Sequence, residues 1–454
     1  MSASEAPGLR LVVSHDNGVR VGELSYAPPD DRWTFEYDAE WRRARPFQLS
    51  PAFPFQPPEG GYDSRAIRRF IVNLFPEGAP LRAAVEQLHV SPSNAFALLR
   101  NMGGETTGAL EFRGVDQPAP AEAPHRLLPR EELAERVATA KEGGLTVWDG
   151  KVRMSIAGYQ DKLAVFALDN PGDHADASMW LAEPPIASTF ILKPQPHGDR
   201  TPHLVVNEHF CMRLASLYGA AVPDVAIMRL PTPVLVVPRF DRQFVQRNAR
   251  AEVTKLHVID ACQACDLPVE LKYERPHGST GELANMRDGM SLRRLFGTSH
   301  LMRRPAAARL EFLRWALFQV TLGNSDAHGK NFSFFVEREL LEPAPWYDIV
   351  SVEQYPKLDN TFAMAVGDAF TWDALTPFEL AHFAHVCGID RKLLQRETQR
   401  LARAMAKAEA LLDFEGYSSE EREFLRPIAQ LATSRSQALV DHAKKAQVFT
   451  AEHF

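Results

Sequence analysis

The pattern of apolar and polar positions predicts short strands mixed with helices up to about residue 240, and mostly helices after about residue 255. In residues 10–26, two strand-forming runs flank Asn17 and Gly18. This pair suits a tight type I′ turn, so we expect a β-hairpin there. Residues 32–41 can add a third strand. A helix, SRAIRRFIVNLF, follows and completes a small α+β unit.

A strand-rich segment comes next, and a helix-rich segment completes the chain. Between residues 150 and about 240, one helix over residues 204–219 interrupts the strands and should end at Gly219. A short strand pair, NFSFFVE and the region of Trp346, precedes residues 376–448, which are almost wholly helical in pattern. The strand-forming runs of the middle segment are KVRMSIAG, KLAVFAL, STFILKP and PVLVVPRFD.

A stretch rich in proline and alanine marks a boundary between the predicted domains. Residues 116–129, DQPAPAEAPHRLLP, have the composition of a linker, and a helix with acids in its first turn follows them. Such a bilobal α+β order suits a nucleotide-binding protein, although the order of elements alone is weak support for a function. We expect an N-terminal subdomain over 1–115, a linker over 116–130, a nucleotide-binding, strand-rich lobe over 131–245 and a helical catalytic lobe over 246–454.

The composition is that of a globular protein without an overall attraction for nucleic acid. Of the 454 residues, 45% are hydrophobic and 24% are charged, and the formal net charge is -7. Any contact with DNA would therefore need a local basic patch or a basic partner. No apolar run approaches the roughly 18 residues of a membrane span, and no secretory signal is visible. With only four cysteines, we expect a reduced, cytoplasmic protein.

Two of the cysteines, Cys262 and Cys265, form a CxxC pair. A four-cysteine zinc site would also need Cys211 and Cys387, and the chain has no second CxxC. The run HVIDACQACDLP is better explained as a helix with Val258, Cys262 and Cys265 on one face. Buried cysteine would then act as a small apolar residue.

The stretch GNSDAHGKNFSFF, residues 323–335, concentrates candidate chemistry in one loop between a helix and a strand. Asp326 and Asn331 stand at the D-x-x-x-x-N spacing by which protein kinases place a catalytic base and a metal ligand. Phosphoryl transfer needs such a carboxylate, ligands for Mg²⁺ and a cation on the phosphates. Asp348 follows the next strand pair, so Asn331, Asp348 and ATP could together coordinate Mg²⁺.

Other residues complete the set of groups that this reaction needs. Lys193 ends the run STFILKP, much as the phosphate-gripping lysine of a kinase ends a strand, and Glu208 on the following helix could pair with it. In the loop itself, His328 could relay protons or hold the backbone, and Lys330 could touch the γ-phosphate. Each residue alone has an ordinary structural explanation. It is their order along the chain that favours a kinase.

The chain resembles the HipA family, the serine/threonine kinase toxins of bacterial type II toxin–antitoxin pairs. GNSDAHGKNFS is similar to the family's loop pattern GN-x-D-x-H-x-K-N-x-S, and residues 154–165, MSIAGYQDKLAV, resemble its serine-containing phosphate loop. Further landmarks occur in family order over nearly the whole chain, which implies the family's bilobal, kinase-like α+β fold. They are NAFALLRNMGGETTGALEF, STFILKP, NEHFCMRLASLYG, VVPRFDR, CDLPVELKYE and WYDIVS.

The resemblance implies a role for each candidate residue. Asp326 would be the catalytic base, and Asn331 and Asp348 would be the Mg²⁺ ligands. Lys193 would contact the ATP phosphates. Ser155 would belong to the phosphate loop and would be autophosphorylated. The other ATP-binding residues that the resemblance implies are Ile156, Ala157 and Gly158 in the phosphate loop and Val237, Arg239 and Phe240 in the hinge that meets adenine.

Two residues depart from what we expect of the family. Pro238 stands in the hinge, where proline has no amide hydrogen to donate. Tyr159 makes the phosphate loop bulkier than glycine or alanine would. Both departures concern the geometry of nucleotide binding and leave the chemical groups in place.

The resemblance also implies partners. These are a small helix-turn-helix antitoxin of the HipB kind, which would carry the protein to operator DNA, and a protein substrate. An aminoacyl-tRNA synthetase such as glutamyl-tRNA synthetase is the expected substrate, and its phosphorylation would arrest growth. Two alternatives stay open. One is a catalytically weak kinase-fold corepressor that acts with an antitoxin on DNA, and the other is a small-molecule or lipid kinase, because lipid kinases also use a D-x-x-x-x-N loop.

Overall fold

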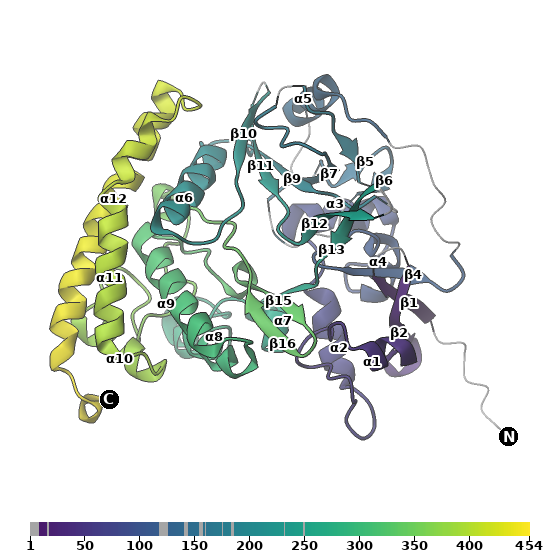
Figure 1. The fold of residues 1–454 in the computed structure, drawn as a ribbon, viewed down its shortest axis with the longest axis horizontal. Helices are drawn as coiled ribbons and strands as arrows, with labels where there is room; N and C mark the ends of the chain where they lie inside the picture. The colour runs from purple at the N-terminus through teal and green to yellow at the C-terminus, as the bar shows by residue number, and fades with distance from the viewer. Residues whose placement is uncertain are drawn as a thin grey trace. The chain divides into compact units, whose positions relative to one another are not determined.

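The computed structural model describes residues 9–15, 18–117, 126–139, 144–153, 158, 160–174, 176–182, 186–230, 232–247 and 250–454. The chain divides into two compact units, each built from segments far apart in the sequence (Figure 1). Among the described helices, none has both the length and the apolar character needed to cross a bilayer. The first unit comprises Met1–His197, Met228–Ile259 and Phe335–Leu340, and the second comprises Gly198–Ile227, Asp260–Phe334 and Leu341–Phe454.

A four-stranded antiparallel sheet opens the first unit, in the order β3-β2-β1-β4. β1 (Leu9–His15) pairs with β2 (Val19–Ala27), which confirms the predicted hairpin, although Asn17 lies outside the described residues. In β3 (Arg32–Tyr37) every second residue is buried, as expected for a strand with one face on the core. β4 is Leu110–Gly114, and the helices of this part are α1 (Ala39–Ala44), α2 (Ser64–Val72), α3 (Gly78–Leu88) and α4 (Ala95–Met102).

A five-stranded sheet with the order β10-β11-β9-β7-β8 contains most of the runs predicted for the middle segment. Of the run KVRMSIAG, only Lys151–Val152 (β6) is a described strand, and residues 154–157 lie outside the described part. The remaining elements are α5 (Arg130–Thr139), β5 (Val147–Trp148), β7 (Leu163–Phe166), β8 (Trp180–Leu181), β9 (Phe190–Pro194), β10 (Ala226–Arg229), β11 (Pro233–Pro238), β12 (Arg242–Arg247) and β13 (Arg250–Lys255).

A buried network of charges joins the segment after β11 to the N-terminal part of the first unit. Arg239 contacts Glu105 at 2.9 Å and Asp241 at 2.7 Å, and Arg242 contacts the same two carboxylates at 3.0 and 2.8 Å. These side chains expose only 2–6% of their surface. Burial raises the pKa of Glu105, but Lys255, Arg242 and Arg239 outweigh it and lower the pKa to about 2.

A short segment from late in the sequence completes the first unit. The amide of Gln48 donates to the carbonyl oxygen of Arg338 at 2.9 Å, and the amide of Arg338 donates to the carbonyl oxygen of Pro46 at 2.8 Å. Phe47 and Arg338 form a parallel β-bridge. Backbone groups near residue 47 are therefore hydrogen-bonded to a residue that lies about 290 positions later in the sequence.

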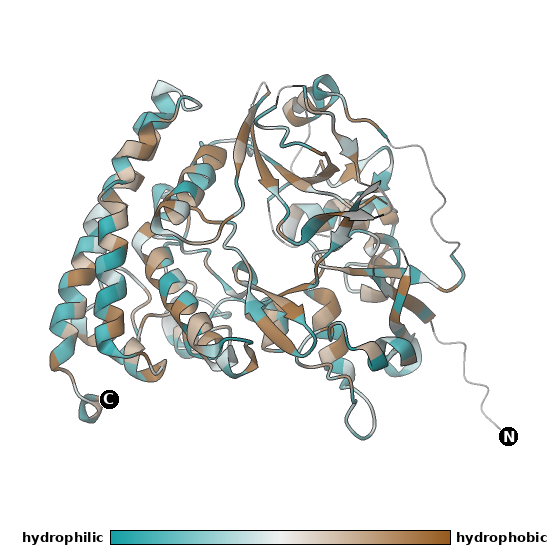
Figure 2. Cartoon of the chain, viewed as in Figure 1, coloured by the Kyte–Doolittle hydropathy of each residue, from teal (hydrophilic) through white to brown (hydrophobic). Residues whose placement is uncertain are grey.

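The second unit is mostly helical, as the pattern predicts. α6 (Leu204–Tyr218) ends at Gly219, whose φ of +89° suits glycine, and this confirms the predicted stop. Along the neighbouring helices α11 and α12, hydrophobic and hydrophilic stripes alternate (Figures 1 and 2). The other helices are α8 (Leu292–Gly297), α9 (Pro305–Leu322), α10 (Pro377–Val386), α11 (Arg391–Met405) and α12 (Ser419–Lys445).

Two predictions of local structure need correction. The run around Cys262 is not one helix, because Val258–Asp260 forms strand β14 and only Ala261–Ala264 (α7) is helical. The side chain of Asp260 accepts the amide of Gln263 and so starts the helix at Ala261. The second strand of the late pair, β16 (Leu340–Pro343), ends before Trp346. Together with β15 (Ser333–Glu337) these strands form a sheet in the order β14-β15-β16.

We predict that Glu105→Gln lowers the free energy of unfolding by about 3–5 kcal/mol, because it leaves buried guanidinium groups with too little negative charge. Urea titration of both proteins measures the change. The matched control is Glu23→Gln, which removes a partly exposed carboxylate paired with Arg10 and Arg20 and should cost less than about 1 kcal/mol.

The same network gives a pH dependence. Because the folded-state pKa of Glu105, about 2, lies below its ordinary value of 4.5, its stabilisation is present at neutral pH. It is lost as the pH falls from 4.5 towards 2. Equal losses for Glu105→Gln and Glu23→Gln, or a stability independent of Glu105 in this pH range, would contradict the assignment.

Candidate active site

The loop of residues 323–335 begins at Gly323, where α9 ends. Gly323 has a φ of +61°, and a Cβ atom there would lie 2.4 Å from the carboxylate of Glu353, so only glycine fits. Arg435 fixes that carboxylate through two contacts of 2.5 and 2.8 Å. The direction in which the chain leaves α9 is therefore determined by packing as well as by the glycine.

Asp326 is an exposed acid in a largely buried loop. Its side chain keeps 55% of its surface exposed, whereas His328 keeps 6% and Lys330 keeps 3%. The amide of Asp326 donates to the side-chain oxygen of Asn324 at 3.1 Å, and Asn324 in turn donates to Gln319 at 2.8 Å. An accessible carboxylate on a fixed backbone is suited to accept a proton from a substrate hydroxyl.

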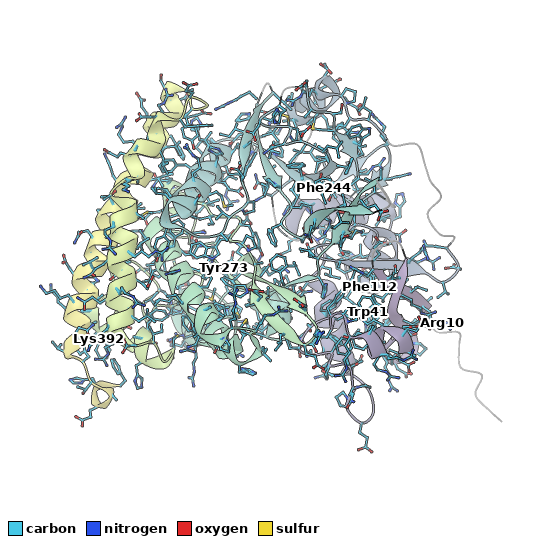
Figure 3. The ribbon with its side chains drawn as sticks, viewed as in Figure 1. Arg10, Trp41, Phe112, Phe244, Tyr273 and Lys392 are labelled. Carbon is cyan, nitrogen blue, oxygen red and sulfur yellow. The ribbon has the colours of Figure 1, made fainter. Side chains whose placement is uncertain are left out.

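Tyr273 is a candidate site residue that the sequence motifs did not single out (Figure 3). Its hydroxyl donates a hydrogen bond to Oδ1 of Asp326. Its ring packs edge-on against the ring of His328, with centroids 4.9 Å apart, and Nε2 of His328 lies 3.7 Å from the same Oδ1. Tyr273 and His328 together orient the carboxylate. The sequence did contain a signal for this residue, because Tyr273 lies in CDLPVELKYE, one of the stretches that resemble the family.

Asn331 closes the loop. Its side-chain nitrogen donates to the carbonyl oxygen of Asp326 at 2.7 Å, and its backbone amide donates to the carbonyl oxygen of His328 at 2.9 Å. The nitrogen of a neutral amide can only donate, so the group that Asn331 can offer to a metal is its amide oxygen. Oxygen is the ligand atom that Mg²⁺ prefers.

Lys330 forms a buried ion pair with Asp260. Its Nζ lies 2.7 Å from Oδ2 of Asp260, and the two side chains keep 3% and 10% of their surface exposed. The other oxygen of Asp260 starts α7. In this arrangement the ammonium group of Lys330 holds the loop to α7, so a contact with the γ-phosphate, as the sequence suggested, would have to share that ammonium group with Asp260.

Asp348 lies in a strained segment that is bonded to the loop. Tyr347, the residue before it, donates to the carbonyl oxygen of Lys330 at 2.6 Å and shares a hydrogen bond of 2.7 Å with Ser333. Asp348 itself has a φ of +56°, in the left-handed region that residues other than glycine seldom adopt. Such strain is often found at functional sites, where the surrounding contacts maintain it.

The first unit contains the remaining candidate residues. Lys193 is buried on β9, opposite Leu235 of β11. Gly158 has a φ of +122°, and a Cβ atom there would lie 2.6 Å from Nζ of Lys162, a second buried lysine that sequence reasoning did not single out. Ser155, Ile156, Ala157 and Tyr159 lie outside the described residues.

The hinge residues are engaged in structural contacts. Val237 and Pro238 pair with Ile191 and Phe190 of β9. The amide of Arg239 donates to the carbonyl oxygen of Thr189 at 2.9 Å, and its guanidinium belongs to the buried charge network. The ring of Phe240 packs edge-on against Phe335, with centroids 6.0 Å apart. A contact between Arg239 and adenine would therefore have to use groups other than its guanidinium.

The surroundings of the cysteines favour a structural role, and Glu208 is a buried acid. All four cysteines are free thiols, and burial raises the pKa of Cys262 well above its usual range. No cysteine belongs to a group of potential metal ligands in the part of the chain that the structure describes. This agrees with cysteine as a small apolar residue. Glu208 is buried on α6.

Comparisons with known proteins cover nearly the whole chain. The model of a HipA-like C-terminal domain matches residues 154–409, and that of a HipA N-terminal domain matches residues 13–113. The chain is 36% identical over 416 residues to the serine/threonine-protein kinase toxin HipA of Shewanella oneidensis, covering 90% of this chain and 92% of the relative. It is 33% identical over 364 residues to the putative kinase Y4mE of Sinorhizobium fredii, covering 77% of this chain and 79% of the relative.

A solved structure is similar over the same extent. It is a complex of HipA, HipB and operator DNA from Shewanella oneidensis MR-1. The match has a TM-score of 0.84 and 33% sequence identity, and it covers 97% of this chain and 100% of the other. The expected bilobal, kinase-like α+β fold is thereby confirmed.

We predict that Lys330→Met lowers the free energy of unfolding by about 3–5 kcal/mol, because Asp260 is left buried without its cation. The double variant Lys330→Met/Asp260→Asn should recover most of this loss, since asparagine still caps α7. Thermal and urea unfolding measure both changes. Lys357→Met is the control, because Lys357 pairs with Asp199 on the surface. A double variant no more stable than Lys330→Met would show that the pair does not act as a unit.

Proposed function

The chain belongs to the HipA family of serine/threonine kinase toxins, and from this we propose that it transfers the γ-phosphate of ATP to a serine or threonine side chain of a protein. The observation that carries the proposal is the exposed carboxylate of Asp326, set in a buried loop that Asn331 closes at the kinase spacing. An exposed acid on a rigid loop is the arrangement that a positioned base requires.

Asp326 would orient the acceptor hydroxyl and take its proton as the oxygen attacks the γ-phosphorus. Proton transfer to a positioned base typically contributes about 10²–10⁴ in rate. Tyr273 donates to Oδ1 of Asp326 and would act as a positioning residue. His328 is buried and packs against Tyr273, which supports a role in holding the base rather than in relaying protons.

Asn331 and Asp348 would hold Mg²⁺ on the ATP phosphates. Their side chains offer only oxygen to a metal, because the amide nitrogen of Asn331 acts as a hydrogen-bond donor, and this donor set fits Mg²⁺. When bound, Mg²⁺ would neutralise charge on the phosphates. From the family resemblance we also propose that Lys193 contacts the ATP phosphates and that the segment from Ser155 to Gly158 acts as the phosphate loop.

The acceptor is proposed from the family resemblance. We propose an aminoacyl-tRNA synthetase, such as glutamyl-tRNA synthetase, as the protein target, so that its phosphorylation arrests translation and growth.

We also propose that Ser155 is autophosphorylated. A phosphate on that serine would add a charge of about -1.5 to -2 and would compete with ATP for Lys193 and the loop amides, which would switch the kinase off.

The proposed partner is a HipB-like helix-turn-helix antitoxin in the cytoplasm. The support is the similar structure, in which a HipA protein is complexed with HipB and operator DNA. The formal net charge of this chain is -7, which gives it no general attraction for DNA. Its association with operator DNA is therefore proposed to depend mainly on the antitoxin.

We predict that Asp326→Asn abolishes phosphoryl transfer and growth arrest but keeps Mg·ATP binding, whereas Asp348→Ala loses Mg·ATP binding itself. Removing the base slows the chemical step, while removing one of two metal ligands weakens nucleotide binding. Growth curves after induction and calorimetry with Mg·ATP separate the two effects. Asp373→Asn, an acid on the surface of the same unit, is the control and should behave as the unchanged chain does.

Phosphoproteomics after brief expression of the unchanged chain and of Asp326→Asn identifies the target. A phosphosite on a synthetase and one dominant autophosphorylation site at Ser155, both absent with Asp326→Asn, are expected. Growth arrest by well-expressed Asp326→Asn would refute the base assignment. A chain acting only as a corepressor would transfer no phosphate in any variant. A small-molecule kinase would add no protein phosphosites beyond those seen with Asp326→Asn.

We predict that the purified chain alone does not shift operator DNA at physiological salt, whereas its complex with the antitoxin does. The reason is the net negative charge of the chain, which gives little release of counterions from DNA. A mobility-shift titration at two salt concentrations measures both species. Tight, salt-sensitive binding by the lone chain would show that it carries its own DNA-binding surface.

A further inference from the structure

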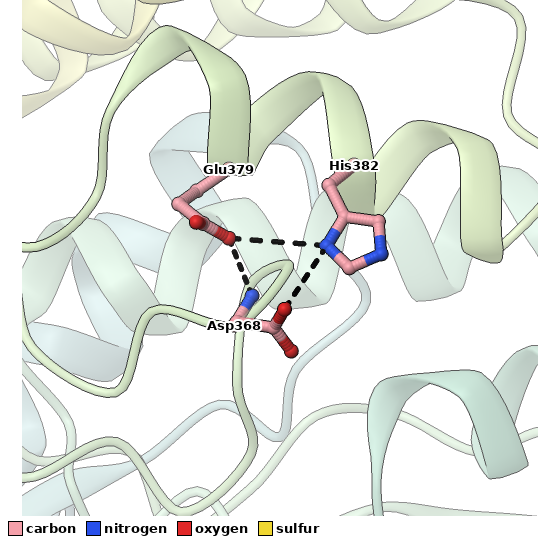
Figure 4. A group of neighbouring side chains, drawn as sticks. All are labelled: Asp368, Glu379 and His382. Atoms are coloured by element: carbon pink, nitrogen blue, oxygen red, sulfur yellow. Dashed lines mark hydrogen bonds and ion pairs between the residues drawn. The ribbon is translucent and has the colours of Figure 1, made fainter. Parts of the chain in front are cut away.

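A cluster of side chains able to bind a metal lies outside the loop of residues 323–335 (Figure 4). Asp368 comes from the segment that precedes α10, and Glu379 and His382 come from α10 itself. One ligand atom of each lies within 4.8 Å of the other two. Among the described residues, no other group of three or more histidine, cysteine, aspartate or glutamate side chains converges in this way.

The distances from His382 to the two carboxylates are longer than ordinary hydrogen bonds and slightly longer than those between ligands around a metal. Nδ1 of His382 lies 3.5 Å from Oδ2 of Asp368 and 3.9 Å from Oε2 of Glu379. Ligands around tetrahedral zinc, with bonds of about 2.0 Å, lie about 3.3 Å apart. Nδ1 is itself buried and has no hydrogen-bond partner within the described ranges, which is costly for a polar atom unless another group binds it.

Second contacts hold both carboxylates in position. Arg287 binds Oδ1 of Asp368, so Oδ2 is the oxygen that faces His382. Oε2 of Glu379 accepts the backbone amide of Asp368 at 2.5 Å. Gly367 makes this approach possible, because a Cβ atom there would lie 2.4 Å from Glu379. Outer contacts of this kind are what fix the ligands of protein metal sites.

The imidazole and the local charge also suit a cation. The ring of Phe454 stacks on His382 with an interplanar angle of 12°, which restricts rotation of the imidazole. Arg287 also contacts the carboxylate of Glu274 at 2.5 Å, and Arg275 lies close enough to affect the same carboxyl group. The acids around the cluster are Glu274, Asp368 and Glu379, and the permanent cations are Arg275 and Arg287. The acids therefore outnumber the permanent cations, which favours the binding of a positive ion.

We propose that Oδ2 of Asp368, Oε2 of Glu379 and Nδ1 of His382 bind a divalent transition-metal ion, with Zn²⁺ as the best match. Mg²⁺ and Ca²⁺ prefer ligand sets made only of oxygen, whereas an imidazole nitrogen with carboxylates suits zinc and its neighbours. Water completes the coordination. The ion fastens the segment around Asp368 to α10, and this role is independent of the kinase chemistry.

Titration of the metal-stripped full chain with ZnCl₂ in a calorimeter tests the site. One equivalent should bind to the unchanged chain, and Co²⁺ in its place should give visible absorption bands typical of nitrogen and oxygen ligands. His382→Ala should abolish this binding, and Glu379→Gln should weaken it at least about 10-fold. The matched control is His385→Ala, because His385 lies one turn further along α10 and also stacks on Phe454.

A thermal melt of each metal-free protein shows whether the variants fold. The unchanged chain should gain thermal stability with ZnCl₂, and His382→Ala should gain none. Absence of a one-equivalent binding event in the unchanged chain overturns the proposal. So does a His382→Ala protein that binds Zn²⁺ as tightly as His385→Ala does, since the histidine would then be only an ion-pair partner of the two acids.

Discussion

Both units are organised by charges that are removed from water and must therefore be paired. In the first unit, Arg239 and Arg242 bring together Glu105, from the N-terminal part, and Asp241, from the segment after β11. In the second, Lys330 ties the candidate catalytic loop to α7. An unpaired charge in either place would cost several kcal/mol, so these pairs admit few alternative arrangements of the segments that carry them.

This pairing explains how an exposed acid can still be well positioned. Asp326 reaches solvent, where a protein substrate can meet it, but the residues around it are buried and hydrogen-bonded. The loop is held by the ion pair between Lys330 and Asp260, and its start is held by the close packing of Gly323 against Glu353. The carboxylate of Asp326 is accessible to solvent, whereas the residues of the loop that would hold it in place are buried.

Local features of the sequence were sufficient for most of the elements, but not for strand β14 or the end of β16, and for the order of candidate chemical groups. Gly219 ends its helix as predicted, and Asp326, Asn331 and Asp348 follow one another on the expected elements. The partners of these groups could not be predicted. Lys330 pairs with a residue 70 positions away, Tyr273 reaches Asp326 across 53, and no periodicity links such residues. The family resemblance implies a contact between Arg239 and adenine, but it does not reveal that the guanidinium of Arg239 is engaged in the buried charge network.

The backbone bonds between Arg338 and residues 46–48 set an order of events during synthesis. The first unit is finished only when the segment Phe335–Leu340 has left the ribosome, because that segment belongs to it. By then Asp326 and Asn331 have been made, because both precede this segment in the sequence. A nascent chain that stalls before Asp326 has neither a complete first unit nor the candidate base. Translation itself thus delays the completion of the first unit until most of the candidate catalytic loop has been made.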